Sequence, residues 1–136
     1  MTLSSVEIQE RFDKLLAIIE ETFREKQPER ADALLVMYTE LADLIKYAPA
    51  SSRKHFHNAY EGGYIDHILN VYENSLEMVR IFAKRGGKIN FTKEELVFAA
   101  LHHDLGKIGD LDAPYYLPQE SEWHRNKLGE LYKKNS

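Results

Sequence analysis

Apolar residues recur at three- and four-residue spacings along most of the chain, which is the period of an amphipathic α-helix. The first stripe follows Ser4, which lies three residues before Glu7 and forms a capping box with it, and predicts a helix over residues 5–26. A second stripe begins after Pro28, a residue suited to the first turn of a helix, and ends at Ile45. Two such stripes separated by a short break predict an antiparallel helical hairpin that serves core packing.

After a loop-like stretch, the periodic pattern returns and predicts a third helix from Tyr64 to about Lys84. The Gly62-Gly63 pair before it suits a tight backbone turn that leads into a helix. His67 lies at the edge of the apolar arc, where a half-buried functional side chain would be expected. The arc comprises Ile65, Ile68, Leu69, Val71, Tyr72, Leu76, Met78, Val79 and Phe82.

A second capping box, formed by Thr92 and Glu95, predicts a short helix. Residues 96–101 of this helix are all apolar and leave it no polar face, so we expect it at the centre of the protein. His103 and Asp104 come just after this run. Polar groups placed so deep must be satisfied by partners or by a metal ion.

The rest of the chain is loop-like, with a short helix expected near residues 121–132 and no strand expected anywhere. The sequence therefore predicts an all-α fold in a single domain over residues 1–136. We divide this domain into an N-terminal helical hairpin (1–47), a metal-site core (48–112) and a C-terminal extension (113–136).

Composition and charge narrow the classes of function. The net charge of −4 argues against nucleic-acid binding by bulk charge, although it is compatible with a local basic patch. Residues 53–57 form a small basic and aromatic cluster in the loop before the third helix. The absence of cysteine excludes disulfides, zinc–thiolate sites and thiol nucleophiles, and agrees with a cytoplasmic protein. No run of 18 apolar residues and no signal pattern is present, so we expect neither a membrane span nor export.

Two imidazoles and one carboxylate form a donor set suited to a divalent transition metal. His67 lies on one predicted helix, and His103 with Asp104 lies at the end of another, 36 residues further on. Manganese, iron, cobalt, nickel and zinc all accept such ligands. If the helix persists, Lys107 shares a face with His103, and an ammonium group beside a metal suits a phosphate. We assign His102 either a supporting role behind the ligands or a structural role, because its side chain points about 100° away from that of His103.

This arrangement resembles the HD domain of metal-dependent phosphohydrolases, which is named for its His…His-Asp…Asp metal ligands. The segment 57–67 is similar to the first motif of some members, in which a histidine, a double glycine and a second histidine occur in this order. The HD domains of certain 3′–5′ exoribonucleases are similar here. The segment 98–107 resembles the central helix of the family, and the segment 115–124 is similar to small HD proteins of phages. The main resemblance covers about residues 47–112.

The resemblance implies an HD-like helical bundle in which a metal-activated water attacks a phosphate ester. It makes His67, His103 and Asp104 the metal ligands, with Asp104 also placed to bridge and to act in catalysis. Lys107 matches a lysine near the substrate phosphate. His57 matches a histidine close to the site, suited to phosphate contact or to proton transfer.

One departure concerns the last ligand of the family, an aspartate on a helix well downstream. Asp110 and Asp112 follow the His-Asp pair very closely, and His124, Glu120 and Glu122 are further candidates. Three interpretations stand: a shortened form of the domain, a site completed by another group or subunit, or a degenerate site. We favour the first.

Three functions are therefore compared. The leading hypothesis is a metal-dependent phosphohydrolase whose substrate is a nucleotide or phosphodiester, either a phosphorylated small molecule or a nucleic-acid end. The alternative is a non-catalytic nucleotide- or metal-binding HD module with an incomplete metal site. The third is a helical interaction domain whose hairpin self-associates, and homo-oligomerisation is left open. Phe56, Tyr60 and Tyr64 are placed to stack on a base, although aromatic residues at a helix entrance are more often part of a core.

Overall fold

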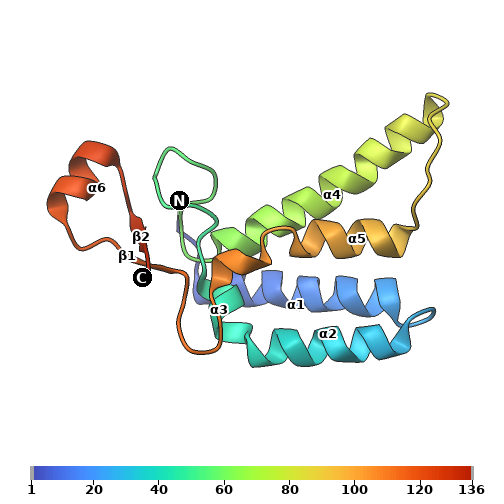
Figure 1. Cartoon of the computed structure of the whole chain (residues 1–136), viewed down its shortest axis with the longest axis horizontal. Coiled ribbons are helices and arrows are strands. Elements are labelled where there is room, and N and C mark those ends of the chain that lie inside the picture. Colours follow the sequence, from blue (N-terminus) through green and yellow to red (C-terminus); the bar gives the residue numbers. More distant parts are fainter. Residues whose placement is uncertain (1, 136) are drawn as a thin grey trace.

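The computed structural model describes residues 2–135, about 60% of the chain being helical (Figure 1). In chain order, the elements are α1 (Ser5–Phe23), α2 (Pro28–Glu40), α3 (Ala42–Tyr47), α4 (Gly63–Lys84), α5 (Lys93–His102), the 3-10 helix η1 (Leu105–Ile108), β1 (Tyr116–Pro118), α6 (Glu122–Leu128) and β2 (Tyr132–Lys134). The all-α expectation therefore describes most of this structure, but not its C-terminal part.

Helix α1 lies at the centre of the helical body and contacts α2, α3, α4 and α5. The Ser4 side chain accepts a hydrogen bond from the backbone of Glu7, and the Glu7 carboxylate accepts one from Ser4, so the predicted capping box begins the helix. Leu15, Ile19 and Phe23 are fully buried along one face of α1. The body therefore has a continuous apolar core, and its inner residues follow the predicted stripes.

The second predicted helix is interrupted. Its backbone leaves helical geometry at Leu41, which divides the stripe between α2 and α3. Ile45, at the end of the stripe, is still fully buried. The expectation of one unbroken helix is therefore wrong. The apolar stripe is still buried at its end, because α3 carries Ile45 into the core after the break at Leu41.

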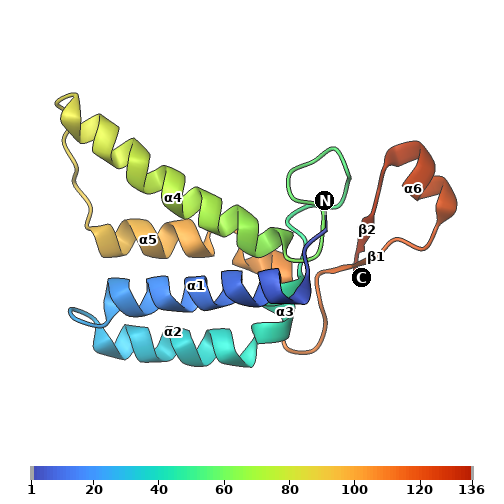
Figure 2. The same ribbon diagram turned by 180° about the vertical axis from the view of Figure 1, so that it is seen from behind.

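Helix α4 is anchored in the core only over its first half. Ile65 and Ile68 are fully buried, whereas Met78 is 69% exposed and Phe82 is 55% exposed. Figure 2 shows the C-terminal half of α4 diverging from α1 and α5. The apolar arc of this helix was expected to be buried, and the structure contradicts that expectation at Met78 and Phe82, although Tyr72 still packs against the core.

Helix α5 is covered on one side only. Val97, Ala100 and Leu101 face the core, whereas Phe98 and Ala99 are exposed. The expectation that this helix is buried on every side is therefore wrong. It lies at the surface of the body, and its C-terminal end is accessible to solvent.

Residues 115–135 form a unit that we call the C-terminal arm, and it projects from the helical body (Figure 1). Within it, β1 pairs with β2 in antiparallel fashion, with Leu117 opposite Lys133. No strand was expected here, and that expectation is wrong. The short helix expected near residues 121–132 is present as α6, although it ends at Leu128. The helix ends before Gly129, whose positive φ of 65° reverses the chain so that β2 can pair with β1.

No helix within residues 2–135 has the length and apolar content needed to span a bilayer.

Candidate metal centre

Three predicted ligand atoms converge at the junction of α4 and α5. The Nε2 atoms of His67 and His103 lie 3.2 Å apart, and the Asp104 Oδ2 atom lies 3.1 Å from His67 Nε2 and 3.2 Å from His103 Nε2. The side chains come from the first half of α4 and from the chain just beyond α5. These two helices pack against each other, which brings residues separated by 36 positions into contact.

The end of α5 fixes the orientation of His103. The His103 Nδ1 atom lies 2.8 Å from the backbone oxygen of Ala100, and a carbonyl oxygen can only accept a hydrogen bond. Nδ1 therefore carries the proton, and the lone pair of Nε2 points at His67 and Asp104. A backbone carbonyl in this role is typical of histidines that bind metals, because it sets both the tautomer and the angle of the ring.

The spacing of the three atoms fits a bound ion. Two ligands about 2.1 Å from a metal in tetrahedral geometry lie about 3.4 Å from each other, close to the separations between His67, His103 and Asp104. Burial lowers the pKa of His67, and the neighbouring His57 lowers it further, against the opposing effect of Asp104. A lowered pKa favours the neutral imidazole, which is the form that ligates a metal. The set is thus able to hold a divalent ion.

Lys107 lies beside the Asp104 carboxylate, but not because it shares a helical face with His103, as the sequence suggested. The α-helix ends at His102, so His103 and Lys107 do not share a helical face. Lys107 instead lies in η1, where its Nζ atom is 3.6 Å from Asp104 Oδ2 and donates a hydrogen bond to the Ala50 oxygen at 3.2 Å. A positive charge therefore lies next to the Asp104 carboxylate.

His57 is brought to the site by the loop before α4. Its ring centroid lies 4.6 Å from that of His67, and the hydroxyl of Ser51 donates to the His57 backbone oxygen. Gly63 lets this loop approach the helix, because a Cβ at that position would be 2.0 Å from the backbone oxygen of Asn58. The glycine pair therefore serves the close approach of two backbones as well as the turn.

Sequence reasoning missed a polar cluster that anchors the start of α4. The carboxylate of Asp66 pairs with the guanidinium of Arg11 from α1 and accepts a hydrogen bond from the Tyr60 hydroxyl at 2.7 Å. Because Asp66 precedes His67, this cluster ties the ligand-bearing turn to α1 and to the loop. Arg11 lies outside the apolar stripe of its helix, so periodicity gave no signal for this contact.

His102 has the structural position expected of it. Its Nδ1 atom lies 2.7 Å from the Phe98 backbone oxygen, and its ring lies between Tyr38 and Phe98, with centroid distances of 5.8 Å and 4.5 Å. Its Nε2 atom is buried without a hydrogen-bond partner among the described residues. Burial lowers the pKa of His102, so the imidazole is held neutral.

The residues considered for a fourth ligand lie elsewhere. Asp110 accepts hydrogen bonds from the backbone of Asp112 and Ala113 and closes a turn. The Nδ1 atom of His124 lies 2.7 Å from the Ser121 hydroxyl at the start of α6. Within residues 2–135, no further histidine or carboxylate joins the group of His67, His103 and Asp104. Glu120 and Glu122 likewise lie outside this group.

No protein-family model, curated protein or solved structure matches this chain.

Proposed function

We propose that the protein is a metal-dependent phosphohydrolase of the HD type that acts on a nucleotide or phosphodiester. One observation carries the proposal: His67, His103 and Asp104 converge within 3.2 Å of one another, with the ammonium group of Lys107 next to the carboxylate. Two imidazoles, one carboxylate and one cation are what a metal-assisted attack on a phosphate needs.

Each side chain has a distinct role in this proposal. His67, His103 and Asp104 hold a divalent ion, which when bound supplies a Lewis acid and a water of lowered pKa. Lys107 cannot ligate a metal while protonated, so its partner is an oxygen of the substrate phosphate. His57 is exposed beside His67, where it can hydrogen-bond to the phosphate or carry a proton.

Catalytic metal sites commonly combine three protein ligands with a position left for water or substrate. The three ligands of this group fit that pattern. The alternative function, a non-catalytic nucleotide- or metal-binding module, is favoured by the same observation if the chemistry needs the fourth ligand of the HD family. Hydrolysis distinguishes the two functions, because both bind a metal and only one turns over substrate.

The proposal is tested by assaying the purified chain with each of five divalent ions, Mn²⁺, Fe²⁺, Co²⁺, Ni²⁺ and Zn²⁺. The substrates are bis(p-nitrophenyl) phosphate and a panel of nucleotides. We expect metal-dependent release of p-nitrophenol or phosphate, with His103→Ala reduced to background. His124→Ala is the matched control with bis(p-nitrophenyl) phosphate: this histidine lies in the C-terminal arm, outside the three-residue group, and its loss should leave the rate on this small substrate unchanged. Metal binding without turnover of any substrate would favour the non-catalytic module.

A further inference from the structure

We propose that the substrate of this site is a single-stranded nucleic acid, which binds along a basic and aromatic surface leading to the metal centre. The inference rests on the proposed phosphohydrolase function and specifies its substrate class. The surface consists of the loop Arg53–His57, which we call the basic loop, and the adjoining C-terminal arm.

The basic loop combines cationic and aromatic side chains. Phe56 is 48% exposed, with the guanidinium of Arg53 5.8 Å from the centre of its ring and the ring of His55 4.7 Å away. An exposed aromatic ring beside a guanidinium group is suited to stacking on a base while the guanidinium pairs with a phosphate. Nothing in the apolar core requires this ring, because Phe56 lies outside the core cluster.

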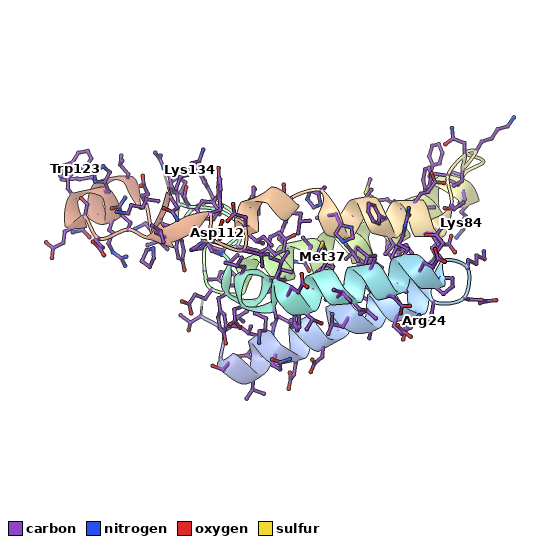
Figure 3. The ribbon with its side chains drawn as sticks, turned by 60° about the horizontal axis from the view of Figure 1, so that its bottom comes forward. Arg24, Met37, Lys84, Asp112, Trp123 and Lys134 are labelled. Carbon is purple, nitrogen blue, oxygen red and sulfur yellow. The ribbon has the colours of Figure 1, made fainter. Side chains whose placement is uncertain are left out.

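The C-terminal arm is joined to this loop through its backbone. Lys54 N donates to the Gly129 oxygen at 2.8 Å, and Arg53 forms an isolated antiparallel bridge with Glu130. The aliphatic part of Lys54 lies over Gly129, where an added Cβ would be 3.1 Å from it. The loop and the arm are therefore one continuous surface. Figure 3 shows Trp123, which is 59% exposed, at the outer end of the arm, and Lys134 nearer to the helical body.

Charge is distributed unevenly over the chain. Residues 51–58 and 115–135 carry six of its 18 Lys and Arg residues and only three of its 22 Asp and Glu residues. These two segments are net positive although the chain as a whole is −4. None of the six basic side chains forms an ion pair with another described residue; they are Arg53, Lys54, Arg125, Lys127, Lys133 and Lys134. Unpaired cations of this kind are available for phosphates.

The basic loop ends at the metal centre. His57 is its last residue, and the ring of His57 lies 4.6 Å from the ring of His67. A strand whose bases stack on Phe56 and whose phosphates follow Arg53 and Lys54 would reach the three ligand atoms at one of its ends. A mononucleotide is too short to pair with cations in both the basic loop and the arm, whereas the successive phosphates of a strand can pair with them.

The test measures binding of a fluorescently labelled 12-nucleotide single strand by anisotropy in the presence of chelator, so that neither metal nor hydrolysis enters the result. Removing two phosphate contacts with the double variant Arg53→Gln, Lys54→Gln should lower the dependence of log affinity on log salt by about 1.4. The double variant Arg85→Gln, Lys88→Gln is the matched control: it loses the same charge from exposed residues at the far end of α4. It should bind like the parent.

Stacking is tested separately. Phe56→Leu should weaken binding roughly 5- to 150-fold, the range for loss of one stacked base. Phe91→Leu, which removes a ring that is 39% exposed near the start of α5, should not. Thermal melting of each variant checks that the fold is intact.

Several outcomes would overturn the inference: no binding by the parent, equal binding by the parent and the Arg53, Lys54 variant, or an unchanged affinity of Phe56→Leu. Displacement of the strand by polyphosphate of equal charge at equal concentration would also overturn it, because bases would then contribute nothing. A parent that hydrolyses bis(p-nitrophenyl) phosphate but does not bind the strand refutes this inference and leaves the proposed function standing. Strand binding without any hydrolysis refutes the proposed function, and it reduces the strand from a substrate to a bound ligand.

Discussion

His67 Nε2 and Asp104 Oδ2 lie 3.1 Å apart although 37 positions separate the two residues in the chain. The contact joins the first half of α4 to the segment that follows α5, and His103 completes a compact group. One ligand comes from a helix held in place by Asp66 and Arg11, and the other two come from the point where α5 ends. The group is thus built by packing of helices rather than by a local loop.

The ammonium group of Lys107 should affect catalysis more than metal binding. Lys107→Ala removes a cation that lies 3.6 Å from Asp104 Oδ2. If it pairs with the phosphate mainly in the transition state, the rate should fall roughly 10- to 150-fold, equivalent to about 1.5–3 kcal/mol. Steady-state rates and metal content are compared with those of the parent, with Lys107→Arg as the variant that keeps the charge. Equal activity in all three proteins would reject the phosphate role.

The helices before residue 48 should contribute stability and not chemistry. Leu15→Ala empties a fully buried position in α1 and should cost about 2–5 kcal/mol of the free energy of unfolding. Val36→Ala, at a position that is 57% exposed, should change it by less than about 0.5 kcal/mol. Denaturant titration measures both values. Turnover per folded molecule should be the same in both variants, and a large loss in Leu15→Ala would mean that α1 helps to shape the site.

Gly63 should be intolerant of any side chain. Gly63→Ala places a Cβ 2.0 Å from the Asn58 backbone oxygen, so the loop that carries His57 must move. We expect a loss of about 1–3 kcal/mol in stability, as is usual for overpacking. Gly106→Ala is the control, because an added Cβ there meets nothing within 4 Å. Melting curves compare the two variants, and equal stability would show that the close approach of loop and helix is dispensable.

Stability in the presence of chelator should fall as the pH falls below neutrality. Burial lowers the pKa of His102 in the folded chain, whereas the unfolded chain titrates near 6.5. The unfolded state therefore binds more protons between these two pKa values, and the free energy of unfolding decreases as the pH drops through that interval. His67, whose pKa is also lowered, acts in the same direction.

His102→Phe should make this pH dependence shallower, and His55→Gln, which alters an exposed histidine, should not. Urea titrations between pH 5 and pH 8 provide the comparison. The account of His102 would be refuted by parallel stability curves for the parent and His102→Phe.

Much of this structure could be predicted from the sequence, because both capping boxes and the main apolar stripes act locally. The boxes at Ser4 and Thr92 begin α1 and α5 as expected. The grouping of His67, His103 and Asp104 was also expected, since both helices that carry it have apolar faces that must pack.

The remaining features depend on tertiary contacts that periodicity does not encode. The Arg11–Asp66 pair joins residues 55 positions apart and lies outside any apolar stripe. The strands β1 and β2 are only three residues each, too short for an alternating pattern to be recognised. In the second half of α4 the apolar residues Met78, Ile81 and Phe82 are exposed, and the sequence of the helix does not reveal that no other element covers them.

Metal stoichiometry tests the central claim most directly. The protein is incubated in turn with Mn²⁺, Fe²⁺, Co²⁺, Ni²⁺ and Zn²⁺, passed through a desalting column and subjected to elemental analysis, in parallel with Asp104→Ala and the control His124→Ala. We predict that the parent and His124→Ala retain one of these ions with the same stoichiometry and that Asp104→Ala loses it. Retention of the full metal content by Asp104→Ala, or no retained ion in the parent, would contradict the assignment of His67, His103 and Asp104 as a metal centre.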